Sequence, residues 1–158
     1  MPPVQQAQVV GVHRPARRGV NMSRVVWEGV DEFGQWLHDT PGVVVKDVEA
    51  ALYQEGENIM GVSKRRTPVD HGYLRSGGHA KSGENIPEPW VTKAKTQGGK
   101  TMVSLNYGAS YAVYVHEILT NQHPVGQAKF LESAVKEGMD GMVGRIKDRV
   151  LDRIGRRT

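Results

Sequence analysis

Residues 65–75 read Arg-Arg-Thr-Pro-Val-Asp-His-Gly-Tyr-Leu-Arg and mark a change of pattern along the chain. The residue before a proline is biased toward extended backbone, so Thr67 is expected to end the helical pattern that precedes it. Pro68 cannot continue a helix and pre-sets a turn. Asp70 can accept a hydrogen bond from a nearby backbone amide, and Gly72 can adopt a positive φ angle. The stretch therefore predicts a joint between a long helix and a region of strands.

Two long helices are expected on either side of this joint. Apolar residues at helical spacing predict the first over 43–66 and the second over 127–154. Gly56 and Gly61 weaken the first helix, and they either mark a close helix crossing or make the helix shorter or bent. In the second helix the apolar stripe is continuous, although three glycines interrupt the helical propensity: Gly138, Gly141 and Gly144.

The region between the long helices is expected to be a small antiparallel sheet. Its candidate strands are 74–80, 90–96 and 101–107, with a hairpin turn at 97–100 and an exposed loop at 82–89. Shorter segments complete the pattern: a strand at 24–29, a helix at 31–38, a strand or helical turn at 111–116, and a loop at 118–126. Strands flanked by long helices favour an α+β fold, with the sheet packed against the two helices in one domain over 23–158.

The composition restricts the class of protein. A chain of 158 residues suits one domain with extensions. No apolar run is long enough to span a membrane, and the start of the chain lacks the apolar region of a secretory signal. The absence of cysteine excludes disulfides and thiolate metal sites and fits synthesis in a reducing cytoplasm.

The positive charge is concentrated at the two ends of the chain, which has a net charge of +4. Residues 1–22 contain prolines, glycines and no hydrophobic period, so they predict an extended arm. Arg14, Arg17 and Arg18 make this arm basic, and we expect it to dock on a neighbouring subunit or to face DNA in a channel. The other basic end runs from Arg145 to Arg157. Plain solubility explains such charges equally well.

Three fragments resemble catalytic or metal-binding motifs but are incomplete. Residues 99–101 end like a phosphate-binding loop, yet they lack its earlier glycine and the helix that must follow. His116 begins like a zinc-protease motif, but Thr120 stands where the second histidine belongs. Asp70 and His71, with Ser76 nearby, suggest a catalytic triad, but they lack the nucleophile elbow and the in-line arrangement of nucleophile, base and orienting residue. A turn or a polar loop explains each fragment better.

Binding of nucleic acid remains an alternative. The basic ends, together with Trp90, Lys93 and Lys95, could form a cationic surface with one aromatic platform. No helix-turn-helix, zinc-finger or RNA-binding signature is present, so this alternative is a module that does not read sequence.

Three segments occur in a recognisable order. Residues 66–76 follow a long helix, Tyr-Ala-Val-Tyr-Val-His-Glu follows at 111–117, and Gly-Gln-Ala-Lys-Phe-Leu-Glu-Ser-Ala-Val opens the terminal helix at 126–135. This order resembles the tail-completion family of long-tailed bacteriophages, also known as minor tail or head-to-tail joining proteins. The matching positions are Pro68, Val69, Asp70, Gly72, Leu74, Arg75, Tyr111, Ala112, Tyr114, Val115, Phe130 and Leu131.

The chain departs from the family pattern at three places. His71 stands where a small hydroxyl residue is common, and the glycines at 77–78 replace an apolar continuation. Residues 116–118, His-Glu-Ile, replace a more frequent acidic-aromatic-glycine run, which puts the local loop geometry in question. The basic arm lies outside the matched region.

The resemblance implies a structural virion protein of the neck, without enzymatic activity or cofactor and without a membrane partner. It implies a ring, expected to contain six copies, that joins the head connector or stopper to the tail tube or tail terminator after assembly in the host cytoplasm. Nonspecific contact with passing DNA is also expected, and the virion alternative is a minor capsid or head-completion stopper protein. The joint and interface candidates are Pro68, Val69, Asp70, Gly72, Tyr73, Leu74, Arg75, Tyr111, Tyr114, His116, Phe130 and Leu131.

Overall fold

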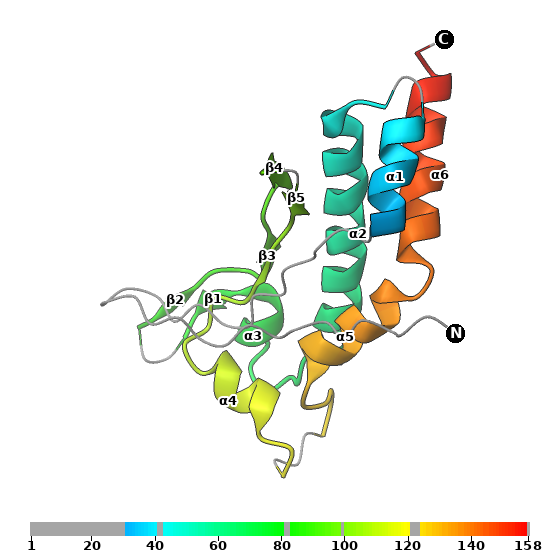
Figure 1. The fold of residues 1–158 in the computed structure, drawn as a ribbon. Coiled ribbons are helices and arrows are strands. Elements are labelled where there is room, and N and C mark those ends of the chain that lie inside the picture. The colour runs from blue at the N-terminus through cyan, green and yellow to red at the C-terminus, as the bar shows by residue number, and fades with distance from the viewer. Residues whose placement is uncertain (1–30, 41–42, 81–82, 99, 121–123, 158) are drawn as a thin grey trace.

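The computed structural model describes residues 31–40, 43–80, 83–98, 100–120 and 124–157 (Figure 1). Within them the chain has an α+β fold, in which helices pack on small antiparallel sheets, as the sequence predicts. The expected arm at 1–22 and the expected strand at 24–29 lie outside the described residues.

Helix α2, Val45–Arg66, is the central element. It begins and ends close to the predicted bounds, as does the short helix α1, Asp31–Asp39. At the C-terminal end of α2, Thr67 has the extended angles φ −63° and ψ 129°, as expected of a residue before proline. Thr67 still donates its amide hydrogen to Ser63 O at 2.9 Å, so the last turn of the helix is closed.

The second long helix is not continuous, contrary to the prediction for 127–154. The structure has two helices, α5 at Phe130–Met139 and α6 at Met142–Gly155. Asp140 is extended and Gly141 has φ +63°, a left-handed conformation that glycine adopts without steric cost. The chain turns at Gly141. Helix α5 crosses the C-terminal part of α2, and α6 then runs beside α2 in the antiparallel direction (Figure 1).

A buried ion cluster joins α2 to α6. Glu55 is almost fully buried, and its Oε2 accepts hydrogen bonds from Arg145 Nε at 3.0 Å and Nη2 at 2.9 Å. Its other oxygen accepts from Arg149. The charge of this buried carboxylate is thus compensated by two guanidinium groups that reach in from the surface.

The strands are shorter and more divided than predicted. They are β1 Gly78–His79, β2 Asn85–Ile86, β3 Trp90–Val91, β4 Lys95–Gln97, β5 Lys100–Met102 and β6 Leu105–Asn106. They form three two-stranded antiparallel ladders, β1–β2, β3–β6 and β4–β5. The predicted hairpin turn is confirmed, because Gln97 pairs with Lys100 and Gly98 has φ +58°.

A bulge explains why 90–96 and 101–107 are not continuous strands. The register joins Val91 to Leu105 in one ladder and Lys95 to Met102 in the other. Two residues, 93–94, therefore oppose Val103 alone, which is the arrangement of a β-bulge. The β3–β4 and β5–β6 segments form one two-stranded β-ribbon that packs against α2, where an added Cβ on Gly56 would lie 2.9 Å from Val91 Cγ1. The close helix crossing predicted at Gly56 is therefore wrong, because Gly56 approaches Val91 and Val103 of the β-ribbon and not another helix.

The predicted strand at 74–80 is wrong for its first half. Residues Tyr73–Ser76 form the helical turn α3, because the amides of Arg75 and Ser76 both donate to Gly72 O at 3.0 Å. Gly77 has φ +68° and ends the turn, and Gly78, with φ +127°, is the first residue of β1.

Two short segments remain. The segment at 111–116 takes the helical alternative, as α4 at Ala112–Glu117. The expected loop at 82–89 contains β2, which pairs with β1.

Candidate functional site

The first family-like segment meets the start of the third through the loop that precedes α5. Gln127 donates its amide hydrogen to Arg66 O at 2.9 Å, and Val69 donates to Val125 O at 3.3 Å. Gly126 between them has φ +90°, and a Cβ there would lie 2.5 Å from Pro68 N. The loop can approach the joint this closely because Gly126 has no side chain.

A groove of about 570 Å³, here named the joint groove, lies at this meeting point. Residues 68–74 line one side, and Tyr111, Val115, Pro124 and Val125 line the other. The predicted candidates Pro68, Val69, Asp70, Gly72, Tyr73, Leu74 and Tyr111 thus share one surface. Burial raises the pKa of Tyr111 above its usual value, and the nearby carboxylates of Glu84 and Asp70 add to the rise.

The pair at 70–71 does not form a catalytic arrangement in this groove. The Asp70 side chain is 94% exposed and contacts His71 Nδ1 at 3.0 Å, and among the described residues it caps no backbone amide. The sequence-based expectation that Asp70 caps the turn is therefore not met. His71 stacks on Tyr73 with ring centroids 5.9 Å apart. The Ser76 hydroxyl donates to Gly72 O at 3.0 Å, away from the histidine.

Arg75 lies behind the groove and ties α3 to the end of α2. Its Nη2 donates to Arg65 O at 3.3 Å and to Thr67 O at 3.4 Å. Its Nε is buried and has no hydrogen-bond partner within the described part of the chain. In this arrangement Arg75 closes the C-terminal end of α2, where backbone carbonyls lack helical partners.

His116, Phe130 and Leu131 belong to the core and do not line the groove. His116 Nδ1 lies 2.7 Å from Glu117 Oε1, and Nε2 accepts a hydrogen bond from the amide of Glu132 at 3.3 Å. The carboxylate requires the proton on Nδ1, and His116 then caps an amide in the first turn of α5. A hydrogen bond from Lys129 holds the pKa of Glu117 below its usual value.

A buried hydroxyl cluster, which the sequence analysis did not identify, lies beneath the joint. Tyr107 OH is 2.7 Å from Ser63 Oγ and 3.0 Å from Thr67 Oγ1. Thr67 Oγ1 also donates to Ser63 O at 2.9 Å. Burial raises the pKa of Tyr107 above its usual value. The only sequence signal was the spacing of Ser63 and Thr67, four residues apart on one helix face.

Apolar side chains are exposed around the joint groove. Tyr114 in α4 is 66% exposed, Leu119 after α4 is 72% exposed, and Val125 in the groove wall is also exposed. Exposed apolar side chains of this size, in the groove wall and in and after the neighbouring helix α4, are consistent with an interaction site.

The remaining candidates have no arrangement for chemistry. Lys100 and Thr101 lie in β5, so a strand stands where a phosphate-binding loop needs a helix. No group of three or more His, Asp or Glu side chains in the described ranges could hold a metal ion. No described helix is long and apolar enough to cross a membrane. Arg14, Arg17 and Arg18 lie outside the described residues.

Comparison with models of protein families, with curated proteins and with solved structures found no match for this chain.

Proposed function

We propose that this chain is a structural subunit of the neck of a long-tailed bacteriophage. It assembles into a closed ring, expected to contain six copies, between the head connector or stopper and the tail tube or its terminator. The role requires no catalysis and no cofactor, and its place is the assembled virion. The observation that carries the proposal is the joint groove, where two of the three family-like segments lie on one surface.

A closed ring requires two different surfaces on each subunit, one of which fits the other on its neighbour. The joint groove is concave and is lined by Tyr111 and Val115 of the α4 segment, in and after which Tyr114 and Leu119 are exposed. Such a surface fits an apolar segment of the next copy, and the basic arm at 1–22 is the segment that we expect to reach it. The third segment contributes to the core, because Phe130 and Leu131 are buried and Phe130 packs edge-on against His116 of α4.

The test measures the assembly state of the full chain. Native mass spectrometry and negative-stain electron microscopy, over a range of concentrations and with purified cognate tails and connectors, should show closed rings or rings formed only on those partners. Leu119→Lys should weaken ring formation, because it places a charge on an exposed apolar position directly after α4. Leu151→Lys is the matched control, since Leu151 is 47% exposed on α6 and does not line the joint groove.

Two outcomes would contradict the proposal. One is a chain that stays monomeric and binds neither tails nor connectors. The other is equal assembly by both lysine variants and the unmodified chain. Neutral residues in place of Arg14, Arg17 and Arg18 test the arm separately, and unchanged joining would exclude its role in docking. Binding to connectors without binding to tails would favour the head-completion stopper.

A further inference from the structure

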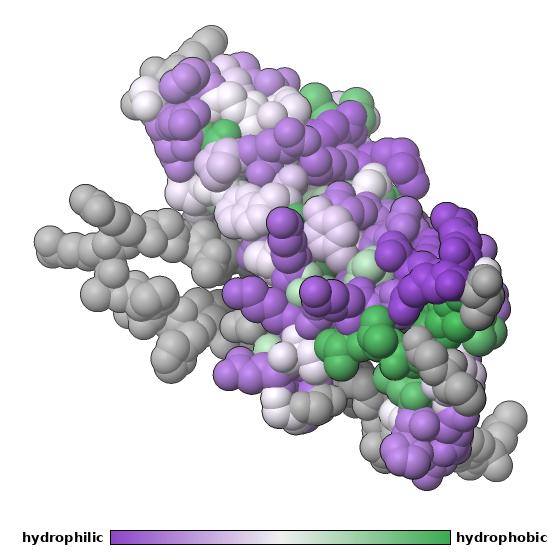
Figure 2. All heavy atoms as spheres, turned by 90° about the horizontal axis from the view of Figure 1, so that it is seen from above, coloured by the Kyte–Doolittle hydropathy of each residue, from purple (hydrophilic) through white to green (hydrophobic). Residues whose placement is uncertain are grey.

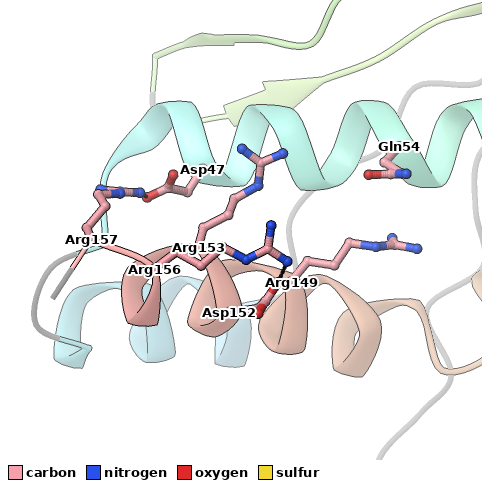
Figure 3. Close-up of a pocket in the computed structure, with 7 residues that line it drawn as sticks. All are labelled: Asp47, Gln54, Arg149, Asp152, Arg153, Arg156 and Arg157. Atoms are coloured by element: carbon pink, nitrogen blue, oxygen red, sulfur yellow. Dashed lines mark hydrogen bonds and ion pairs between the residues drawn. The ribbon is translucent and has the colours of Figure 1, made fainter.

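A second groove, here named the arginine groove, lies between the antiparallel helices α2 and α6 (Figure 3). Its volume is about 480 Å³. Asp47 and Gln54 line it from α2, and the residues from α6 and its C-terminal end are Arg149, Asp152, Arg153, Arg156 and Arg157. Arg149 and Arg153 are four residues apart and lie on one face of α6, and Arg156 and Arg157 follow directly after the helix ends at Gly155.

Two of these arginines are held in place by acidic groups on α2. Arg157 contacts Asp47, and Arg149 contacts Glu55, both of them buried carboxylates. Each guanidinium carries five N–H donors in a fixed plane, and the carboxylate occupies only part of them. The buried acids therefore orient the arginines and leave donors directed to solvent.

The other two arginines are more available. Arg156 is mostly exposed and contacts Asp152 one turn earlier on the same helix, a type of surface ion pair that contributes little to stability. Arg153 is exposed and makes no hydrogen bond or ion pair with any described residue. Four arginines and two aspartates line the groove, so it carries a surplus of two positive charges.

We infer that the arginine groove binds phosphate groups of a nucleic-acid backbone without reading its sequence. The planar guanidinium fork matches phosphate oxygens in a bidentate manner. Arg149 to Arg157 cover about 12 Å at the rise of a helix, while a duplex carries one charge about every 1.7 Å of its axis, so two or more phosphates can be engaged together.

The surroundings favour this ligand over an acidic peptide. All lining residues are polar or charged, and the groove offers no apolar pocket for the kind of anchor that dominates peptide binding. Figure 2 views the molecule from the end where α6 finishes and shows a largely hydrophilic surface, with hydrophobic residues gathered on one side. The inference does not rest on the proposed neck function.

The test measures DNA binding by the full chain. The probe is a fluorescein-labelled 20-base-pair duplex of arbitrary sequence, followed by fluorescence anisotropy between 50 and 200 mM NaCl. The test variant is Arg153→Gln with Arg156→Gln, which leaves the arginines paired with buried acids unchanged. The matched control is Lys93→Gln with Lys95→Gln, which removes the same charge from exposed positions on the β-ribbon.

The logarithm of affinity falls with the logarithm of salt concentration at a slope of roughly 0.9 per phosphate contact, so each contact multiplies the loss of affinity between 50 and 200 mM NaCl by about 3.5. The arginine variant should therefore bind more weakly at 50 mM NaCl, and its loss of affinity across the series should be about 12-fold smaller than that of the unmodified chain. Its thermal melting curve should be unchanged, and the lysine control should retain most of the affinity.

Three results would overturn the inference. The first is an arginine variant whose affinity and salt dependence equal those of the unmodified chain. The second is a loss of binding in the lysine control alone. The third is a chain that does not bind the duplex but binds labelled polyglutamate, with that binding lost when Arg153 is replaced. The groove would then be a site for an acidic protein.

Discussion

Removing the hydroxyl of Tyr107 should measure how strongly the buried hydroxyl groups beneath the joint depend on one another. Tyr107→Phe keeps the aromatic ring, whose centroid lies 5.1 Å from that of Phe130. It deletes the hydrogen bonds to Ser63 Oγ at 2.7 Å and Thr67 Oγ1 at 3.0 Å. Thr67 retains its bond to Ser63 O. Ser63 is fully buried, and its hydroxyl loses its side-chain partner.

The expected cost follows from which groups are left without a partner. A buried polar group that loses its hydrogen bond costs about 1–3 kcal/mol, so Tyr107→Phe should lower the free energy of unfolding by about 2 kcal/mol. Ser63→Ala should cost about 1 kcal/mol, because Tyr107 keeps its bond to Thr67. The double variant removes both partners and leaves neither hydroxyl unsatisfied. It should be no less stable than Tyr107→Phe, which corresponds to a coupling energy of about 1 kcal/mol.

Urea unfolding at 25 °C, followed by tryptophan fluorescence, gives all four free energies of the cycle. Tyr111→Phe is the control, because the Tyr111 side chain is 37% exposed and its hydroxyl makes no hydrogen bond with the described residues. The free energy of unfolding of the control should change by less than about 0.5 kcal/mol. Additive losses in the double variant would refute the reasoning, since they would mean that the hydroxyls act independently.

Three further predictions concern alkaline pH, close packing and the cap of α5. Burial raises the pKa of Tyr107, so the contribution of the neutral phenol to stability is complete below about pH 10 and is lost as pH rises through the folded-state pKa. The midpoint of urea unfolding should therefore fall less with rising pH in Tyr107→Phe than in the unmodified chain. Equal falls in the two proteins would contradict the prediction. Gly138→Ala would place a Cβ 2.4 Å from Ile59 Cγ1 and should cost about 1–3 kcal/mol. Gly144→Ala, with no atom within 4 Å, should be neutral or stabilising by up to about 1 kcal/mol; similar melting temperatures for both variants would exclude the steric argument. His116→Phe keeps an aromatic ring but removes the acceptor for the α5 amide, so thermal unfolding should show a loss of about 1–2 kcal/mol, and an unchanged melting temperature would show that the cap is unimportant.

Local rules predicted the end of α2 well. The extended backbone at Thr67 follows from the proline after it, whatever the rest of the chain does. The same holds for the hairpin turn, where Gly98 has a positive φ angle between paired strands. These features depend on neighbouring residues, and the sequence contains all the information that they need.

Tertiary packing decided the features that were predicted wrongly. The apolar stripe of 127–154 is real, but Gly141 adopts a left-handed conformation and the chain turns there. Gly138 has a function that no periodicity shows, because its missing side chain makes room for Ile59 at the crossing of α5 with α2. Strand propensity at 74–80 gave way to a helical turn that begins at Gly72 and ends at Gly77.

The candidate site was predictable only in part. The joint side of the groove was identified from residue types, and Tyr111 was predicted through the family resemblance. Pro124 and Val125 were not, because the contacts that bring their loop to the joint join backbone atoms, which carry no signature of residue identity. The surplus charge of the arginine groove could have been recognised from the spacing of Arg149, Arg153 and Arg157 on a helix.

The bond between Gln127 and Arg66 has a consequence for the order of folding. It joins backbone atoms about sixty residues apart, and Arg145 reaches Glu55 over a separation of 90 residues. Closing such long loops costs chain entropy before the contacts can repay it. During synthesis α2 is made early and can contact the strands that follow it, yet the face that packs on α5 and α6 has no partner until those helices have been made. The first half of the chain therefore stays incompletely packed until the second half has been made.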